Sequence, residues 1–169
     1  MQSEALVPGV TEEEQEITRL VDTYSPMLLG MCSLMLNDRD LAQDIVQETL
    51  VRAWKHRSRL KENEKGWLVR VAANLCRDYH RSRWWRYVDH RQCADEMELV
   101  APAFETNEIL ELVQRLPLKE KEVIVLFFWN NMTADEIAAA AGISRASVYR
   151  RLEKAKQHLK LELEGEWQR

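Results

Sequence analysis

The stretch MTADEIAAAAGISRASVYRRLEKAKQHL, residues 132–159, decides how the C-terminal part of this chain folds. Thr133 and Glu136 have the spacing of a capping box, which opens a helix. Gly142 supplies a tight turn, and Ser144 is placed to cap a second helix that continues to about residue 164. The stretch therefore predicts two helices joined by a short turn, which is the arrangement of a helix-turn-helix.

The second of these helices has an apolar face and a cationic face. At about 100° per residue, Val148 begins a buried stripe, and the small residue Ala138 lets the two helices cross closely. The outer stripe and its flank contain Ala146, Ser147, Tyr149, Arg150 and Lys154. Small residues followed by cations suit DNA, because Arg reads guanine edges and Lys binds phosphates. The alternative is an αα-hairpin whose last helix is basic only for solubility.

The rest of the chain also has the signals of helices. It contains only five glycines and four prolines, and no segment alternates as a strand does. Thr11 and Glu14 have the spacing of a capping box, and Ser25 and Pro26 look like an N-cap followed by the first residue of a new helix. Helical spacing and caps predict helices at residues 12–24, 26–36, 39–56, about 66–81, 109–116 and 123–129. The predicted fold class is all-α.

A change of composition separates two parts of the chain. Between residues 90 and 106 the periodicity fades, Pro102 appears and the sign of the charge reverses, as in a linker between packed units. We expect two small helical domains, at residues 1–90 and 107–169, joined by a flexible linker at 91–106. The second domain contains the helix-turn-helix.

The net charge of −4 conceals strongly segregated charge. Residues 1–48 contain ten acids and two bases, whereas residues 52–91 contain twelve bases and four acids. Residues 143–160 add six bases and one acid. Two separate basic patches could contact one duplex at two places. The simpler interpretation is that they are ordinary solvated helix faces.

Three segments together resemble the small two-domain bacterial sigma factors of the extracytoplasmic-function (ECF) group. DLAQDIVQETLVRAW at residues 40–54 resembles the region 2 helix that binds core RNA polymerase. GWLVRVAANLCRDYHR at 66–81 resembles the helix that reads the −10 promoter element, and residues 116–159 resemble region 4, which reads the −35 element. The three segments occur in the family order, with a linker in the family position.

The resemblance implies three sets of binding residues. Those implied to bind core polymerase are Asp44, Gln47, Glu48 and Val51. Those implied to contact −10 DNA are Lys61, Asn63, Lys65, Trp67, Arg70, Asn74, Arg77 and Arg81, and those implied to contact −35 DNA are Arg145, Ala146, Ser147, Tyr149, Arg150 and Lys154. Many members have Gly-Thr at positions 146–147 and a base at 149, so the preferred DNA sequence stays open. The resemblance also implies control by an anti-sigma factor.

The chemistry of the residues, taken without the resemblance, also fits the set implied to bind polymerase and the set implied to contact −10 DNA. An acidic stripe cannot be a DNA surface, so a protein partner or plain solvation explains residues 44–51. Trp67 is a stacking platform or a core residue. The run HRSRWWRY at 80–87 mixes cations with aromatics, as single-stranded DNA requires, although Trp84 and Trp85 could equally close the domain or meet a regulator.

Several classes of protein do not fit. The chain has no phosphate-binding glycine loop, nucleophile elbow or His-Glu metal motif, so we expect neither an enzyme nor a cofactor or metal site. Cys32, Cys76 and Cys93 are irregularly spaced, as reduced thiols are. Without a signal sequence or a long apolar run, we expect a cytoplasmic protein that does not insert into membranes. A free-standing helix-turn-helix regulator and a pure adaptor remain the alternatives.

Overall fold

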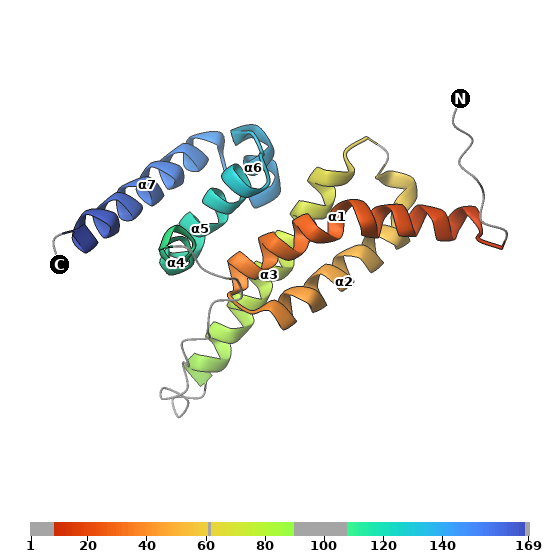
Figure 1. The fold of residues 1–169 in the computed structure, drawn as a ribbon, viewed down its shortest axis with the longest axis horizontal. Helices are drawn as coiled ribbons and strands as arrows, with labels where there is room; N and C mark the ends of the chain where they lie inside the picture. Colours follow the sequence, from red (N-terminus) through yellow and green to blue (C-terminus); the bar gives the residue numbers. More distant parts are fainter. Residues whose placement is uncertain (1–8, 61, 90–107, 168–169) are drawn as a thin grey trace.

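A computed structural model describes residues 9–60, 62–89 and 108–167, and every regular element in these ranges is helical. Figure 1 shows two groups of helices lying side by side. The N-terminal domain comprises α1 (Glu12–Leu36), α2 (Arg39–Lys55), the short η1 (Arg57–Arg59) and α3 (Glu64–Asp89). The C-terminal domain comprises α4 (Glu108–Arg115), α5 (Leu118–Ile124), η2 (Val125–Trp129), α6 (Ala134–Ala141) and α7 (Arg145–Trp167). The all-α, two-domain prediction is confirmed.

The prediction of two separate helices before residue 37 is wrong, because α1 is continuous and contains Pro26. Pro26 lacks the N–H that would bond to the preceding turn. The helix continues because its following turns are buried in the domain core, where Leu28 and Met31 are fully covered. Packing therefore overrides a local stop signal. The capping box formed by Thr11 and Glu14 at the start of α1 is present as predicted.

The three helices of the N-terminal domain share one core. Asp38 caps α2 by accepting a hydrogen bond from the N–H of Leu41 at 3.0 Å. The apolar stripe predicted for residues 39–56 points inward, and Ala42, Ile45, Val46, Thr49 and Ala53 are buried. In α3, Val69, Ala73 and Cys76 are fully buried. This helix is covered on two sides, since it packs on α1 and α2 and also on α6.

The C-terminal domain contains the predicted helix-turn-helix. Thr133 and Glu136 form the second capping box at the start of α6, and Gly142 ends that helix with φ 67°. The expected apolar helix over residues 123–129 is only partly correct. The helix begins at Leu118 and passes into a π-helical turn, η2, that leaves Phe128 59% and Trp129 45% exposed.

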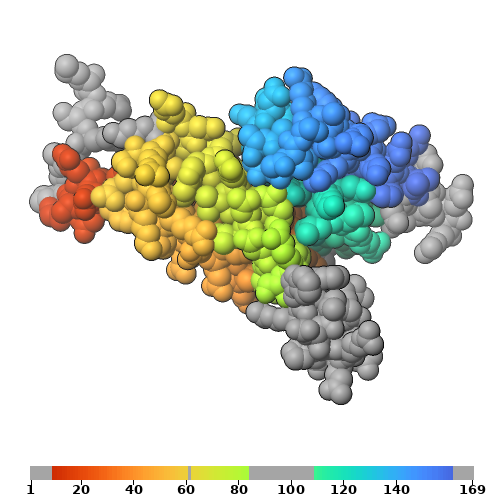
Figure 2. All heavy atoms as spheres, turned by 180° about the vertical axis from the view of Figure 1, so that it is seen from behind, coloured from red at the N-terminus to blue at the C-terminus, as the bar shows by residue number. Residues whose placement is uncertain are grey.

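The two domains contact each other directly. Helix α6 packs on α3, and η2 packs on α1. Figure 2, which views the molecule from behind, shows the C-terminal domain lying against α3. The expected linker at 91–106 lies outside the described residues. No helix in the described part of the chain is both long and apolar enough to cross a membrane.

Candidate nucleic-acid interface

Helix α7 presents its cationic stripe to solvent. The N–H of Ser147 donates to Oγ of Ser144 at 3.1 Å, which confirms the predicted cap. Val148 and Leu152 are buried against the domain, as the angular spacing predicts. The residues expected to contact the −35 element are exposed or partly exposed: Arg145, Ala146, Ser147, Tyr149, Arg150 and Lys154. The stripe is therefore free to enter a groove of DNA.

The side chains of this stripe are held by one another. The guanidinium of Arg150 donates to Oγ of Ser147 at 2.9 Å. Arg145 lies 3.6 Å from a carboxylate oxygen of Asp135, donates to the hydroxyl of Tyr149 at 3.4 Å and stacks 5.7 Å from the centre of that ring. These contacts restrict both guanidinium groups before a ligand binds, which lowers the entropy lost on binding.

Helix α2 carries an exposed acidic face. Asp44, Gln47, Glu48 and Val51 are all exposed, while the opposite face of the helix is buried. Glu48 pairs with Arg52 at 2.7 Å, and both side chains stay about half exposed. An exposed apolar residue, Val51, among acids and an amide gives the face a mixed character that suits a protein partner better than a polyanion.

The start of α3 is anchored by a small network on the N-terminal domain. Oδ1 of Asn63 accepts from the N–H of Gly66 at 3.0 Å. Glu64 accepts from both terminal guanidinium nitrogens of Arg19, Nη2 at 2.6 Å and Nη1 at 3.1 Å, and from the hydroxyl of Tyr24 at 2.9 Å. The Arg19 hydrogen bond lowers the pKa of Glu64, and burial raises the pKa of Tyr24. The network fixes the first turn of α3 and the loop before it.

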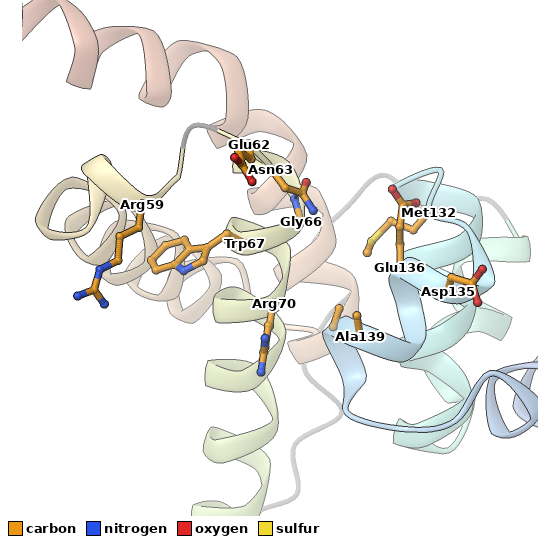
Figure 3. A pocket seen from close by; sticks show the side chains of 11 residues that line it. Arg59, Glu62, Asn63, Gly66, Trp67, Arg70, Met132, Asp135, Glu136 and Ala139 are labelled. Atoms are coloured by element: carbon orange, nitrogen blue, oxygen red, sulfur yellow. Dashed lines mark hydrogen bonds between the residues drawn. The ribbon is translucent and has the colours of Figure 1, made fainter.

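A cleft of about 550 Å³ opens between this loop and α6. Its N-terminal wall includes Arg59, Asn63, Trp67 and Arg70, and its C-terminal wall includes Met132, Asp135, Glu136 and Ala139. Figure 3 shows Trp67 projecting from α3 on the side of Arg59. Arg59 is not among the residues that the sequence predicted to contact DNA, although it is a base that shortly precedes a basic helix.

Trp67 combines features of both predicted roles. Its ring is partly buried against the core, and its centre lies 6.1 Å from that of His56. It also lines the cleft, so one part of the indole is accessible. Trp67 can therefore pack against the core with one part of its ring and remain available for stacking with another.

The other residues expected at the −10 element divide into two groups. Arg70, Asn74 and Arg81 are exposed on α3, and Arg81 lies 3.9 Å from Asp78. Lys65 and Arg77 instead bind the C-terminal domain through their side chains. Lys61 and the side chains of Trp84 and Trp85 lie outside the described residues, as does Cys93.

The interior beneath α3 contains thiols and charged groups. Cys32 and Cys76 are free and buried, as predicted. A hydrogen bond with Cys32 raises the pKa of the Cys76 thiol, and burial acts in the same direction. Burial lowers the pKa of Lys121 and raises that of Glu122. Within the described ranges, no group of three or more His, Cys, Asp or Glu side chains could hold a metal ion.

A helix-turn-helix with an exposed cationic stripe, joined to a second domain with an acidic and a basic face, defines a two-domain DNA-binding protein. The chain matches the family models described as Sigma-70 region 2, over residues 20–86, and Sigma-70 region 4, over residues 106–159. Together the two matches cover more than half of the chain, in the order expected for the family. The chain belongs to the sigma-70 family, in its ECF group, and is an alternative sigma factor.

Curated relatives match along most of the chain. The ECF RNA polymerase sigma factor SigL of Mycobacterium tuberculosis is 28% identical, over 95% of this chain and 96% of SigL. SigW of Bacillus subtilis is 25% identical, over 89% of this chain and 90% of SigW. The protein named "Probable RNA polymerase sigma factor RfaY" of Xanthomonas campestris is 25% identical, and the matched region spans 41% of that longer protein.

Solved structures agree on the fold. The sigma factor RpoE of Bartonella quintana, in complex with the anti-sigma factor NepR, has a TM-score of 0.74 at 20% identity, over 89% of this chain and 98% of RpoE. CnrH, in complex with the cytosolic domain of CnrY, has a TM-score of 0.66 at 23% identity, over 90% of each chain.

Replacing the carboxylate that anchors α3 should reduce stability in a pH-dependent way. Arg19 lowers the pKa of Glu64 in the folded protein below the ordinary glutamate value of 4.5. The ionised carboxylate therefore stabilises the fold fully at pH values above 4.5, and this stabilisation is lost as the pH falls through the lower folded-state pKa. Glu64→Gln should therefore lower the melting temperature at pH 7, and the difference from wild type should shrink below pH 4.5. Thermal unfolding followed by circular dichroism measures both.

The exposed neighbour Glu62 provides the control, because Glu62→Gln removes a carboxylate from the same loop without touching the network. Its melting temperature should follow that of wild type at every pH. A Glu64→Gln deficit that stays constant across pH would contradict the predicted role of this carboxylate.

Proposed function

We propose that this chain binds core RNA polymerase and directs it to promoters whose −10 and −35 elements it reads with separate domains. Residues 1–90 form the region 2 domain, 91–106 the linker and 107–169 the region 4 domain. The observation that carries the proposal is the solvent-exposed stripe of α7, in which Arg150 is oriented by Ser147 on a helix whose other face is buried.

Region 4 binds the −35 element as duplex. The N-terminal half of α7 enters the major groove, where the Arg150 fork reads guanine and Lys154 neutralises phosphate. Ala146 and Ser147 permit close approach of the helix to the bases. Arg145 and Tyr149 contact the flanking backbone. This assignment is supported by the full or partial exposure of all six residues and by the ion pair that holds Arg145.

Region 2 binds the −10 element and stabilises its separated strands. Lys65, Arg70, Asn74, Arg77 and Arg81 lie on α3, and Lys61 and Asn63 precede it in the sequence. Extruding a base costs a few kcal/mol, which stacking on an aromatic ring such as Trp67 and cationic contacts to the single strand can offset. Melting then needs no chemical step, so the protein acts without catalysis or a cofactor of its own.

The acidic face of α2 binds core polymerase through Asp44, Gln47, Glu48 and Val51. The exposure of this face and its mixed acidic and apolar character support a protein partner. A free-standing regulator would have no use for such a face. Since RNA polymerase and the chromosome are cytoplasmic in bacteria, the protein acts in the cytoplasm.

Removing the guanine-reading side chain should impair promoter-specific transcription. Purified core polymerase with the wild-type protein should yield discrete transcripts from the promoters of its own genome, and Arg150→Ala should reduce them about tenfold, because a bidentate Arg–guanine contact is worth about 1–3 kcal/mol. Lys119→Ala removes an exposed base of the same domain outside α7 and should leave the transcripts unchanged. Full promoter-specific activity of Arg150→Ala would contradict the −35 assignment.

Reversing one charge on α2 should weaken the complex with core polymerase. Asp44→Lys should raise the dissociation constant about tenfold, equal to about 1.4 kcal/mol, with most of the effect at low salt. Fluorescence anisotropy of the labelled protein titrated with core measures this change. Asp22→Lys makes the same charge reversal at an exposed position of α1 and should bind as wild type does. Equal affinity of Asp44→Lys and wild type would place the polymerase contact elsewhere.

A cognate anti-sigma factor should form a stable complex with this chain in its host. The fold similarity to RpoE, which was solved in complex with the anti-sigma factor NepR, supports this proposal. The protein recovered with the tagged chain should block core binding and transcription when purified and added back. Recovery of no inhibitory protein under any growth condition would contradict the proposal.

A further inference from the structure

The hydroxyl groups at the start of α7 form a connected set of hydrogen bonds. Oγ of Ser144, the residue before the helix, accepts from the N–H of Ser147 at 3.1 Å. The same Ser144 hydroxyl donates to Oγ of Ser147 at 2.9 Å, and Nη2 of Arg150 donates to that Oγ at 2.9 Å. Ser144 is therefore connected, through Ser147, to the side chain of Arg150.

This set fixes the hydrogen-bonding character of Ser147. A serine hydroxyl has one proton to donate and two lone pairs that accept. Ser144 and Arg150 occupy both lone pairs, which leaves the hydroxyl proton of Ser147 free. Ser147 is partly exposed, so it can meet a ligand as a donor but not as an acceptor.

Arg150 is held in place without losing its charge. Other guanidinium groups of the chain pair with carboxylates, as Arg145 does with Asp135 at 3.6 Å. The partner of Arg150 is instead the neutral hydroxyl of Ser147. A neutral partner restricts the side chain but does not neutralise its positive charge. A guanidinium has several N–H groups, so the bond to Ser147 leaves enough of them for a paired contact with a base.

The free polar groups of this helical turn therefore favour one type of base edge. The Ser147 hydroxyl and the Arg150 guanidinium lie 2.9 Å apart, so they face the same part of a groove, and both are donors. Guanine presents two acceptors, N7 and O6, in the major groove, whereas the amino group of cytosine is a donor. A donor that faces another donor loses its bond to water and gains none in return.

We propose that Ser144 is a positioning residue for the −35 element, which acts through Ser147 to aim the Arg150 guanidinium at a guanine. The inference rests on the proposed binding of the −35 element by α7. Ser144 contributes through the orientation of the other two side chains and not through a contact of its own with a base. Its loss should therefore reduce the preference for guanine more than it reduces the binding of DNA in general.

Ser144→Gly separates this role from the capping of the helix. Glycine is accepted at an N-cap almost as well as serine, but it lacks the hydroxyl that bonds to Ser147. Ser144→Thr retains a hydroxyl and should keep the guanine preference of wild type. Thr133→Gly makes the matched change at the N-cap of α6, in the same domain, and should also keep that preference.

The measurement is transcription by core polymerase with each full-length variant. The templates are promoters of the host genome, randomised through the −35 element and marked with a transcribed barcode, so that sequencing the transcripts gives the base preference at every position. Wild type should prefer guanine at a position where Arg150→Ala removes the preference. Ser144→Gly should reduce the preference there about fivefold, the effect of roughly one net hydrogen bond.

Double substitutions distinguish positioning from a general loss of stability. Adding Ser144→Gly to Arg150→Ala should reduce the preference for guanine no further, since no guanidinium remains to be aimed. Adding it to Ser147→Ala should likewise have no further effect, because Ser144 acts through Ser147. A purely structural role of Ser144 would instead lower transcription from all templates equally, in the single and the double variants alike, and would overturn the proposal.

An unchanged guanine preference in Ser144→Gly would also overturn the positioning role. Wild-type transcripts that remain selective in that case would show that the proposed function stands. Base preferences that Arg150→Ala leaves unchanged would overturn both the assignment of Arg150 and the role of Ser144. If no transcript depends on the wild-type protein, the proposed function itself is wrong, and this inference fails with it.

Discussion

Helix α3 packs on both domains at once, on α1 and α2 in the N-terminal domain and on α6 in the C-terminal domain. The arrangement of the described part of the molecule depends on this double contact. On one side Leu68 and Ala72 complete the core formed with α1 and α2. On another side Arg77 reaches across to the carbonyl end of α6. Because a helix presents different residues every 100°, one element can close a hydrophobic core and carry a cationic face. The apolar contacts hold the helix that carries that face in the core of the N-terminal domain.

The Arg77 guanidinium is bound by backbone carbonyls at the C-terminus of α6, where the helix dipole is negative. Hydrogen bonds from a charged donor are stronger than those between neutral groups. Asn130, whose carbonyl oxygen accepts from Lys65, is buried, and its side-chain amide makes no hydrogen bond with the described part of the chain. The contact between the domains therefore combines favourable charged hydrogen bonds with the cost of a buried, unpaired amide.

Much of the fold could be predicted from local signals. Both capping boxes were found from residues three positions apart, since caps join side chains to the nearest backbone N–H groups. The faces of α2 and α7 followed from spacing alone. The prediction failed at Pro26, where the local preference for a helix start was outweighed by burial of the following turns. It also failed at Trp129, because a run of apolar residues does not show that the helix widens to π geometry at η2 and leaves this residue 45% exposed.

The sequence by itself determined the helices, their apolar and charged faces, the helix-turn-helix and the resemblance to ECF sigma factors. All of these depend on residues within a few turns of one another or on contiguous motifs. Only the tertiary structure decided which faces meet. Arg77 and Ala141 are 64 positions apart, and the contact of Gly30 with Trp129 spans still more of the chain. Periodicity shows that the apolar face of a helix must be covered, but it does not show which element covers it. That element depends on the path of the chain and on the shapes of the two surfaces in contact.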